Sequence, residues 1–196
     1  MLCPYGCDRI WRMDGRDLFG PRRSIRLRGF QHAREGIYFL TIWAYQRRCL
    51  FGIVRDNNVE LSALGRVVAE CWAAIPRHFP HAEMAAHMVM PNHLHGIVVF
   101  QSGSRPNKEH SEVFQRPIAG SFPTLVRSFK AAVTLHARRA GIEPPHAVWQ
   151  RNYFERVLRT GKEYADAMRY ILENPRRWQF DEENPERSPS VQELRW

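Results

Sequence analysis

Two histidines separated by one residue, His93 and His95, open the segment HLHGIVVF, which ends in β-branched residues. Side chains alternate between the two faces of a β-strand, so both imidazoles are expected on one face and Leu94 on the other. Two imidazoles on one face can bind one divalent metal ion. A lone pair of this kind is more often structural or exposed, so the pattern by itself leaves both interpretations open.

A helix predicted over residues 162–174 carries a hydroxyl and an amide on a shared face. At about 100° per residue, Tyr170 and Asn174 lie about 40° apart. The apolar stripe predicted for this helix comprises Tyr164, Met168, Ile171 and Leu172. Tyr170 then points about 140° away from the centre of that stripe. Tyr164 is therefore predicted to be the core tyrosine, and Tyr170 is either a candidate nucleophile or a partly exposed surface aromatic.

The elements that must position these residues follow from hydrophobic periodicity. Strands are predicted over residues 38–43, 83–89, 94–100 and 148–158, and helices over 62–79, 122–139 and 162–174. Pro91 and Asn92 favour a turn between the second and third strands, Pro175 is expected to end the last helix, and residues 101–121 form a polar loop. Because several strands are neighbours in sequence, the pattern predicts an α+β fold with a mainly antiparallel sheet.

Composition favours a folded protein that binds a polyanion. The 196 residues suit a single domain, and 44% of them are hydrophobic. The formal net charge is +9 and comes mainly from arginine, which binds phosphate through a planar fork. Arg26, Arg28, Arg127 and Lys130 are the predicted phosphate contacts.

The expected organisation is a basic N-terminal arm over residues 1–29, a catalytic domain over 30–182 and a charged tail over 183–196. No segment resembles a signal peptide, and none has the ~20 apolar residues of a membrane span. We therefore expect a cytoplasmic, nucleoid-associated protein without a membrane partner.

The chain resembles a known family in several short segments: RRSIRLRGF, RRCLFG, HLHGIVV, WQRNYFERVLR, RYILENP and ENPRRWQFD. Between about residues 22 and 185 the chain resembles the REP-associated tyrosine transposases, which lie within the single-tyrosine HUH transposases. Each segment alone is weak evidence for the family, whereas their combination and order are specific to it.

The resemblance implies a ferredoxin-like antiparallel sheet backed by helices. It implies that His93 and His95 form the metal-binding pair, that Asn174 is a third ligand for Mg²⁺ or Mn²⁺, and that Tyr170 is the nucleophile. The implied substrate is single-stranded or hairpin DNA, which is cleaved and rejoined through a 5′-phosphotyrosine intermediate. Whether the protein is a monomer or a homodimer, and whether Tyr170 acts with its own histidines or a partner's, stays open.

Two other functions compete with this interpretation. One is a DNA-binding protein that has the same fold and does not cleave. The other is a hydrolase of the histidine-triad type, which requires a third histidine where Ile97 stands. Glu155 and His87 are weaker candidates for roles near the metal site.

Overall fold

The computed structural model describes residues 12–13, 16–17, 36–101, 121–144 and 146–187. The chain divides into two units, Met1–Phe30 and Gln31–Trp196. In the first unit, the two-residue strands β1 (Arg12–Met13) and β2 (Arg16–Asp17) pair antiparallel. The predicted contacts Arg26 and Arg28, and the predicted loop except for its first and last residues, lie outside the described residues.

A four-stranded antiparallel sheet forms the centre of the second unit. Its strands are β3 (Gly36–Ala44), β6 (Ala82–Val89), β7 (His93–Phe100) and β8 (Trp149–Leu158). Their order in the sheet is β6-β7-β3-β8, and every neighbouring pair is antiparallel. With one helix-containing crossover after β3 and another after β7, this is the ferredoxin-like arrangement. The α+β prediction is therefore confirmed.

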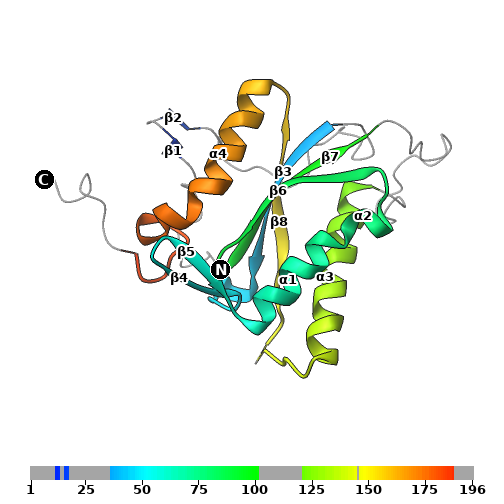
Figure 1. The fold of residues 1–196 in the computed structure, drawn as a ribbon, viewed down its shortest axis with the longest axis vertical. Helices are drawn as coiled ribbons and strands as arrows, with labels where there is room; N and C mark the ends of the chain where they lie inside the picture. Colours follow the sequence, from blue (N-terminus) through cyan, green and yellow to red (C-terminus); the bar gives the residue numbers. More distant parts are fainter. Residues whose placement is uncertain (1–11, 14–15, 18–35, 102–120, 145, 188–196) are drawn as a thin grey trace, which may run out of the picture. The chain divides into compact units, whose positions relative to one another are not determined.

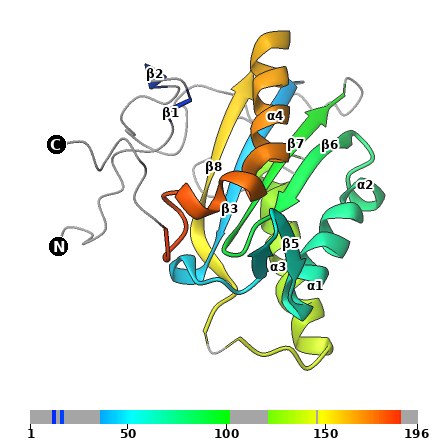
Figure 2. The same ribbon diagram turned by 60° about the vertical axis from the view of Figure 1, so that its left-hand side comes forward.

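Helices cover both faces of the sheet (Figures 1 and 2). They are α1 (Ala63–Ala73), α2 (Ile75–His78), α3 (Phe122–Arg139) and α4 (Gly161–Arg177). On one face, Tyr38 of β3 stacks on Phe122 of α3 with ring centroids 4.7 Å apart. On the other face, Phe39 of β3 and Ile171 of α4 belong to one buried cluster. The helix α4 is thus an addition to the ferredoxin-like core, and it packs on the face opposite to α3.

Three local features differ from the sequence-based predictions. The helix predicted over 62–79 is two helices, since α1 ends at Ala73 and Pro76 lies in the first turn of α2. The hairpin of β4 (Gly52–Arg55) and β5 (Asn58–Leu61) was not predicted, although its turn residues Asp56 and Asn57 have the positive φ angles of a tight turn. Two 3₁₀ turns, η1 (Tyr45–Arg47) and η2 (Trp178–Phe180), complete the fold.

The prediction that Pro175 ends the last helix was wrong. Pro175 is buried inside α4, which continues to Arg177 and is closed by a hydrogen bond from the Trp178 amide to the Pro175 carbonyl. A proline in the last turn of a helix costs one intrahelical hydrogen bond, and only a few residues lie beyond it. Burial of Trp178, which is 8% exposed, holds the chain in place there.

No helix among the described residues has both the length and the apolar character needed to cross a bilayer.

Gly96 of β7 allows an indole ring to pack directly against the strand that carries the two histidines. A β-carbon added at Gly96 would lie 2.3 Å from Cζ2 and 2.4 Å from Cη2 of Trp72 in α1. Trp72 is fully buried and cannot move aside without disturbing the core. Gly96 therefore lets Trp72 pack directly against β7, on the face opposite to the two histidines.

We predict that Gly96→Ala destabilises the protein by roughly 1–3 kcal/mol, the usual cost of overpacking a core. Urea denaturation followed by tryptophan fluorescence measures this change. Gly161→Ala at the start of α4 is the matched control, because nothing lies within 4 Å of the added carbon, and it should alter the free energy of unfolding by less than about 0.5 kcal/mol. Equal stabilities of the two variants would contradict the packing argument.

Candidate active site

His93 and His95 project from the same face of β7, as strand alternation predicts. Both are fully buried, and their Nε2 atoms lie 3.0 Å apart. Leu94 between them is buried on the opposite face. His95 pairs in register with Thr41 of β3 and with Met88 of β6, so the imidazoles lie over the middle of the sheet rather than at its edge.

Tyr170 reaches this pair from α4. Its hydroxyl oxygen is 3.3 Å from Nε2 of His95, and the two rings have centroids 5.1 Å apart at an angle of 69°. Phe39 packs against both rings, at 5.5 Å from His95 and 6.1 Å from Tyr170. The hydroxyl is therefore held beside an imidazole nitrogen within a single chain.

The predicted orientation of α4 was wrong in one respect. Leu172 is 61% exposed rather than part of the stripe, whereas Tyr170 faces the sheet. The observed inner face consists of Tyr164, Ala167, Met168, Tyr170 and Ile171. Counting Leu172 and omitting the small residue Ala167 had rotated the predicted stripe away from Tyr170.

Asn174 lies one turn after Tyr170, and its side chain is 1% exposed. Its Oδ1 atom is buried without a hydrogen-bond partner. A hydrogen bond from the Asn174 side chain to Tyr170 acts to lower the pKa of that phenol. An unpaired buried amide oxygen costs about 1–3 kcal/mol, which makes it a ligand position that a cation could satisfy.

Each histidine has a second hydrogen bond through its Nδ1 atom. Nδ1 of His95 lies 2.9 Å from Oγ1 of Thr41, and Nδ1 of His93 lies 2.8 Å from Oδ1 of Asn92. Such outer partners orient metal-binding imidazoles. Sequence reasoning missed both. Asn92 was assigned only to the turn, and the strand register that brings Thr41 beside His95 is not visible in the sequence.

Burial keeps both imidazoles neutral. It lowers the pKa of His95 to about 3, and it lowers the pKa of His93 well below the usual value, with further contributions from His95 and Arg47. Neutral imidazole is the form that binds a metal ion. Burial, followed by the charge of Asp181, raises the pKa of Tyr170 well above its ordinary value. The phenol is thus protonated until another group stabilises the phenolate.

The donor set fits one divalent cation. Two ligands at right angles, each about 2.1 Å from a cation, are about 3.0 Å apart, which matches the separation of the two Nε2 atoms. The side chain of Asn174 hydrogen-bonds to Tyr170, and its buried, unpaired Oδ1 atom is an oxygen donor that a cation could use. No group of three histidine, cysteine, aspartate or glutamate side chains suited to a metal occurs in the described part of the chain. A metal site here would therefore need the amide of Asn174 as its third protein ligand.

The structure does not bring the other predicted residues to this site. Arg127 is exposed on α3, which covers the opposite face of the sheet. Lys130, also on α3, donates to the carbonyls of Gln150 and Arg151 at 2.6 and 3.2 Å, and burial lowers its pKa to about 8. Their roles as phosphate contacts stay predictions.

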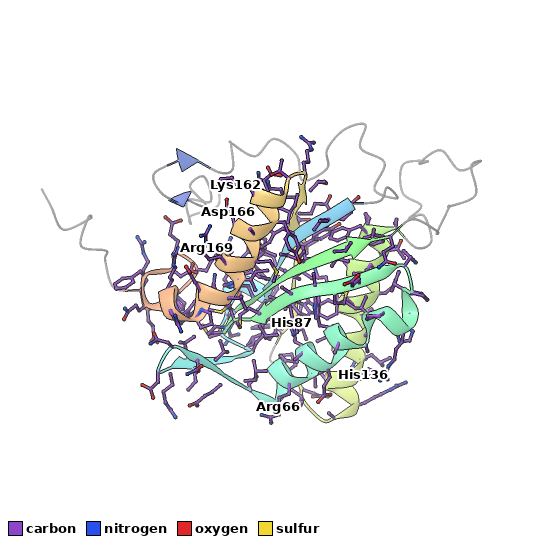
Figure 3. All side chains as sticks on the ribbon, turned by 45° about the horizontal axis from the view of Figure 1, so that its top comes forward. Arg66, His87, His136, Lys162, Asp166 and Arg169 are labelled. Carbon is purple, nitrogen blue, oxygen red and sulfur yellow. The ribbon has the colours of Figure 1, made fainter. Side chains whose placement is uncertain are left out.

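His87 and Glu155 both belong to the face away from the two histidines. His87 pairs with Gly96, so it has the opposite parity to His95, and its ring lies 5.9 Å from Trp72. Figure 3 shows it between β6 and α1. Glu155 pairs with Leu40, which in turn pairs with Gly96. The imidazole of His87 and the carboxylate of Glu155 are therefore on the wrong face of the sheet to reach His93 and His95.

Comparison with known proteins finds a relative by sequence and similar solved structures, one of which is described below. A protein of Haemophilus influenzae, described as uncharacterized, is 37% identical over 167 residues, which cover 82% of this chain and 92% of that protein. The chain belongs to the same family as this Haemophilus protein. No model of a known protein family matches the chain.

The solved structure is that of a REP-associated tyrosine transposase bound to a REP hairpin. It matches with a TM-score of 0.52 and 19% sequence identity, over 76% of this chain and 72% of that one. This likeness shows that the two proteins share a fold. The resemblance noted in the sequence is confirmed at that level.

We predict that the two-histidine site binds Mn²⁺, and Mg²⁺ more weakly because nitrogen ligands suit Mn²⁺ better. Mn²⁺ should raise the melting temperature of the wild-type protein, with about 2.7 kcal/mol of stabilisation at a concentration of 100 times Kd. Asn174→Leu should reduce this gain. Its cost in metal-free buffer should be small, because removal of the unpaired buried oxygen offsets loss of the hydrogen bond to Tyr170. Differential scanning fluorimetry with and without EDTA measures both effects.

Asn152→Leu, at an exposed position of β8, is the matched control and should retain the full response to Mn²⁺. If Mn²⁺ does not change the melting temperature of the wild-type protein, the site does not bind Mn²⁺.

We also predict that the buried imidazole of His95 weakens the metal-free protein in acid. Its pKa is about 3 in the folded state and about 6.5 when unfolded, so below pH 6.5 only the unfolded chain takes up this proton. The stability that His95 provides as a neutral group is therefore complete above pH 6.5 and falls as the pH decreases towards 3. The loss approaches ~1.4 kcal/mol per pH unit.

Urea denaturation of the wild-type protein and His95→Gln in EDTA, at several pH values between 4.5 and 8, isolates this term. The pKa of Asp181, which burial raises to about 7, gives the opposite dependence and is common to both proteins. The difference in unfolding free energy should be constant above pH 7 and should shift in favour of His95→Gln below pH 6. A difference that does not vary with pH would refute the assignment.

Proposed function

We propose that this protein cleaves and rejoins single-stranded or hairpin DNA, with Tyr170 as the nucleophile and with Mg²⁺ or Mn²⁺ held by His93, His95 and Asn174. One observation carries the proposal: the Tyr170 hydroxyl lies 3.3 Å from the Nε2 atom of His95, which is itself 3.0 Å from the Nε2 atom of His93. A tyrosine and a neutral imidazole pair at this distance are the parts that metal-dependent phosphodiester transfer needs.

The proposed reaction replaces one phosphodiester bond with another. The Tyr170 oxygen forms a bond to the phosphorus, the bond from phosphorus to the 3′ oxygen breaks, and the leaving oxygen takes up a proton. The phenolic proton passes to solvent or to a nearby base. The products are a 5′-phosphotyrosine and a free 3′-hydroxyl, and the reverse attack by a 3′-hydroxyl rejoins the strand. No nucleoside triphosphate is consumed.

The residues of the chain have separate tasks in this scheme. His93, His95 and Asn174 hold the cation, which when bound polarises the phosphodiester and favours the phenolate. Phe39 holds the Tyr170 ring against the His95 ring, so the hydroxyl is positioned before DNA arrives. Because the pKa of Tyr170 is raised by burial, the nucleophile stays protonated in the resting protein.

Charge and fold support nucleic acid as the substrate class. The net charge of +9 suits a polyanion. The REP-associated tyrosine transposase that shares this fold is bound to a REP hairpin, so we infer a hairpin as the form of DNA recognised here. The Tyr170 hydroxyl and both imidazoles come from one chain, which supports cleavage by a monomer or by each protomer of a homodimer with its own tyrosine.

The covalent intermediate gives a direct test. The full chain is mixed with Mn²⁺ and hairpin oligonucleotides whose single-stranded flanks are randomised, labelled at either the 3′ or the 5′ end, and run on a denaturing gel. A 3′ label should appear in a protein-linked band, and a 5′ label in a shortened free strand that a polymerase can extend. Tyr170→Phe should abolish both products, as should EDTA.

Tyr164→Phe is the matched control, since Tyr164 lies on the same helix and packs against the same cluster. It should retain cleavage within a few-fold. Retardation on a native gel without any covalent band would instead support a DNA-binding protein that does not cleave. A covalent band that persists in Tyr170→Phe would exclude this tyrosine as the nucleophile.

A further inference from the structure

Asn92 is a fully buried polar residue with all of its side-chain hydrogen-bonding atoms engaged. Its Nδ2 atom donates to the Glu183 carbonyl at 2.6 Å and to the Arg47 carbonyl at 3.1 Å. Its Oδ1 atom lies 2.8 Å from Nδ1 of His93. The side chain thus contacts the metal-binding histidine and two segments that are distant in sequence.

These partners determine how the amide is oriented. Both Arg47 and Glu183 present carbonyl oxygens, which only accept hydrogen bonds, so the NH₂ group of Asn92 must face them. Rotating the amide by 180° would place its oxygen against two other oxygens. The oxygen of Asn92 is therefore directed at His93.

The orientation of the amide in turn sets the tautomer of His93. Oδ1 of Asn92 can only accept, so Nδ1 of His93 carries the proton and donates to it. The Nε2 atom of a neutral imidazole protonated at Nδ1 has a free lone pair, and this is the atom that faces His95. His95 must then carry its proton on Nε2 in the metal-free protein, where it donates to Nε2 of His93, while its Nδ1 atom accepts from the Thr41 hydroxyl. Because that hydroxyl can also accept, the other tautomer of His95 is open once a cation takes the place of the proton.

The backbone around Asn92 is held as firmly as its side chain. The Ala44 amide donates to the Asn92 carbonyl at 2.9 Å, the Phe51 amide to the Pro91 carbonyl at 2.8 Å, and the Met90 amide to the His93 carbonyl at 2.8 Å. Three hydrogen bonds thus hold the turn over residues 90–93, so the backbone from which the Asn92 side chain extends is fixed.

The partner carbonyl of Glu183 belongs to the segment that follows α4. This segment is organised by a hydrogen bond from the Glu183 amide to Oδ1 of Asp181 and by one from the Asn184 amide to the Asp181 carbonyl. Asn92 therefore links the strand that carries the histidines to the end of the helix that carries Tyr170 and Asn174.

We propose that Asn92 is a positioning residue, which fixes His93 in the tautomer that leaves Nε2 free for the cation and fastens the segment after α4 to the same turn. The cation part of this role rests on the proposed function, whereas the tautomer and the attachment are properties of the protein alone.

The tautomer can be read directly. In metal-free protein labelled with ¹⁵N-histidine, two-bond ¹⁵N–¹H correlation spectra at pH 7.5 should show His93 protonated at Nδ1. Asn92→Leu, which has a similar volume and no polar atoms, should give a mixture of tautomers or the Nε2-protonated form. A wild-type His93 protonated at Nε2 overturns the inference even if no variant folds.

A conservative variant separates the two roles. Asn92→Asp keeps an acceptor for Nδ1 of His93 but, as a carboxylate, cannot donate to the carbonyls of Arg47 and Glu183. It should retain the wild-type tautomer and bind Mn²⁺ within a few-fold of the wild-type affinity, and the Glu183 and Asn184 amides should exchange with solvent at least ten-fold faster. Asn92→Leu should lose Mn²⁺ affinity by about 10–100-fold and should show the same faster exchange.

Titration calorimetry with Mn²⁺ and hydrogen exchange measure these changes without DNA. A folded Asn92→Leu with unchanged tautomer and unchanged Mn²⁺ affinity overturns the inference, as does an Asn92→Asp variant that loses the tautomer. A wild-type protein that does not bind Mn²⁺ overturns the cation part of the role and leaves the tautomer and the attachment to be decided by the spectra and by hydrogen exchange. If these measurements agree with expectation and the wild-type protein forms no covalent DNA product, the proposed function fails and the role of Asn92 stands.

Discussion

The close approach of two buried imidazoles is the constraint on which the site depends. Nε2 atoms 3.0 Å apart in a fully buried place cannot both be protonated and charged, because burial already opposes a positive charge on either ring. The pair is stable only as neutral rings whose outer nitrogens are hydrogen-bonded. Thr41 and Asn92 supply those outer hydrogen bonds. The same conditions that make the pair tolerable in the core leave the Nε2 lone pair of His93 facing His95, and the Thr41 hydroxyl lets the proton of His95 move to Nδ1 when a cation binds.

The two faces of the sheet have different tasks. On the face of α1 and α3, Gly96 leaves room for Trp72, and the packing there is closely fitted. On the face of α4, the same strand places His95 beside Thr41 and Tyr170. Because side chains alternate along β7, a shift of one residue in register would exchange these faces and place both histidines against Trp72. The packing around Gly96 thus protects the geometry of the site as well as the stability of the fold.

Patterns within one element were predictable from the sequence, and contacts between elements were not. Alternation placed His93 and His95 on one face, and helical spacing placed Tyr170 near Asn174. The direction of α4 was misjudged because Leu172 was counted and Ala167 was not, and only the sheet beneath decides which residues face inwards. Thr41 and Asn92 act through hydrogen bonds to residues on another strand or around a turn, and these depend on register. The family resemblance predicted the type of reaction, but it did not predict the hydrogen bonds of Thr41 and Asn92 to the histidines.

The position of Tyr170 depends on the inner face of α4 rather than on its charged outer face. Lys162, Asp166 and Arg169 succeed one another along α4 in Figure 3, and Asp166 pairs with both basic residues. Ion pairs at such exposed positions contribute little, because water and salt screen them. Burial of the Ile171 side chain, which follows Tyr170 in sequence, contributes roughly 1.5–3 kcal/mol. Substitutions beneath the helix should therefore displace the hydroxyl, whereas substitutions on its outer face should leave the hydroxyl beside His95.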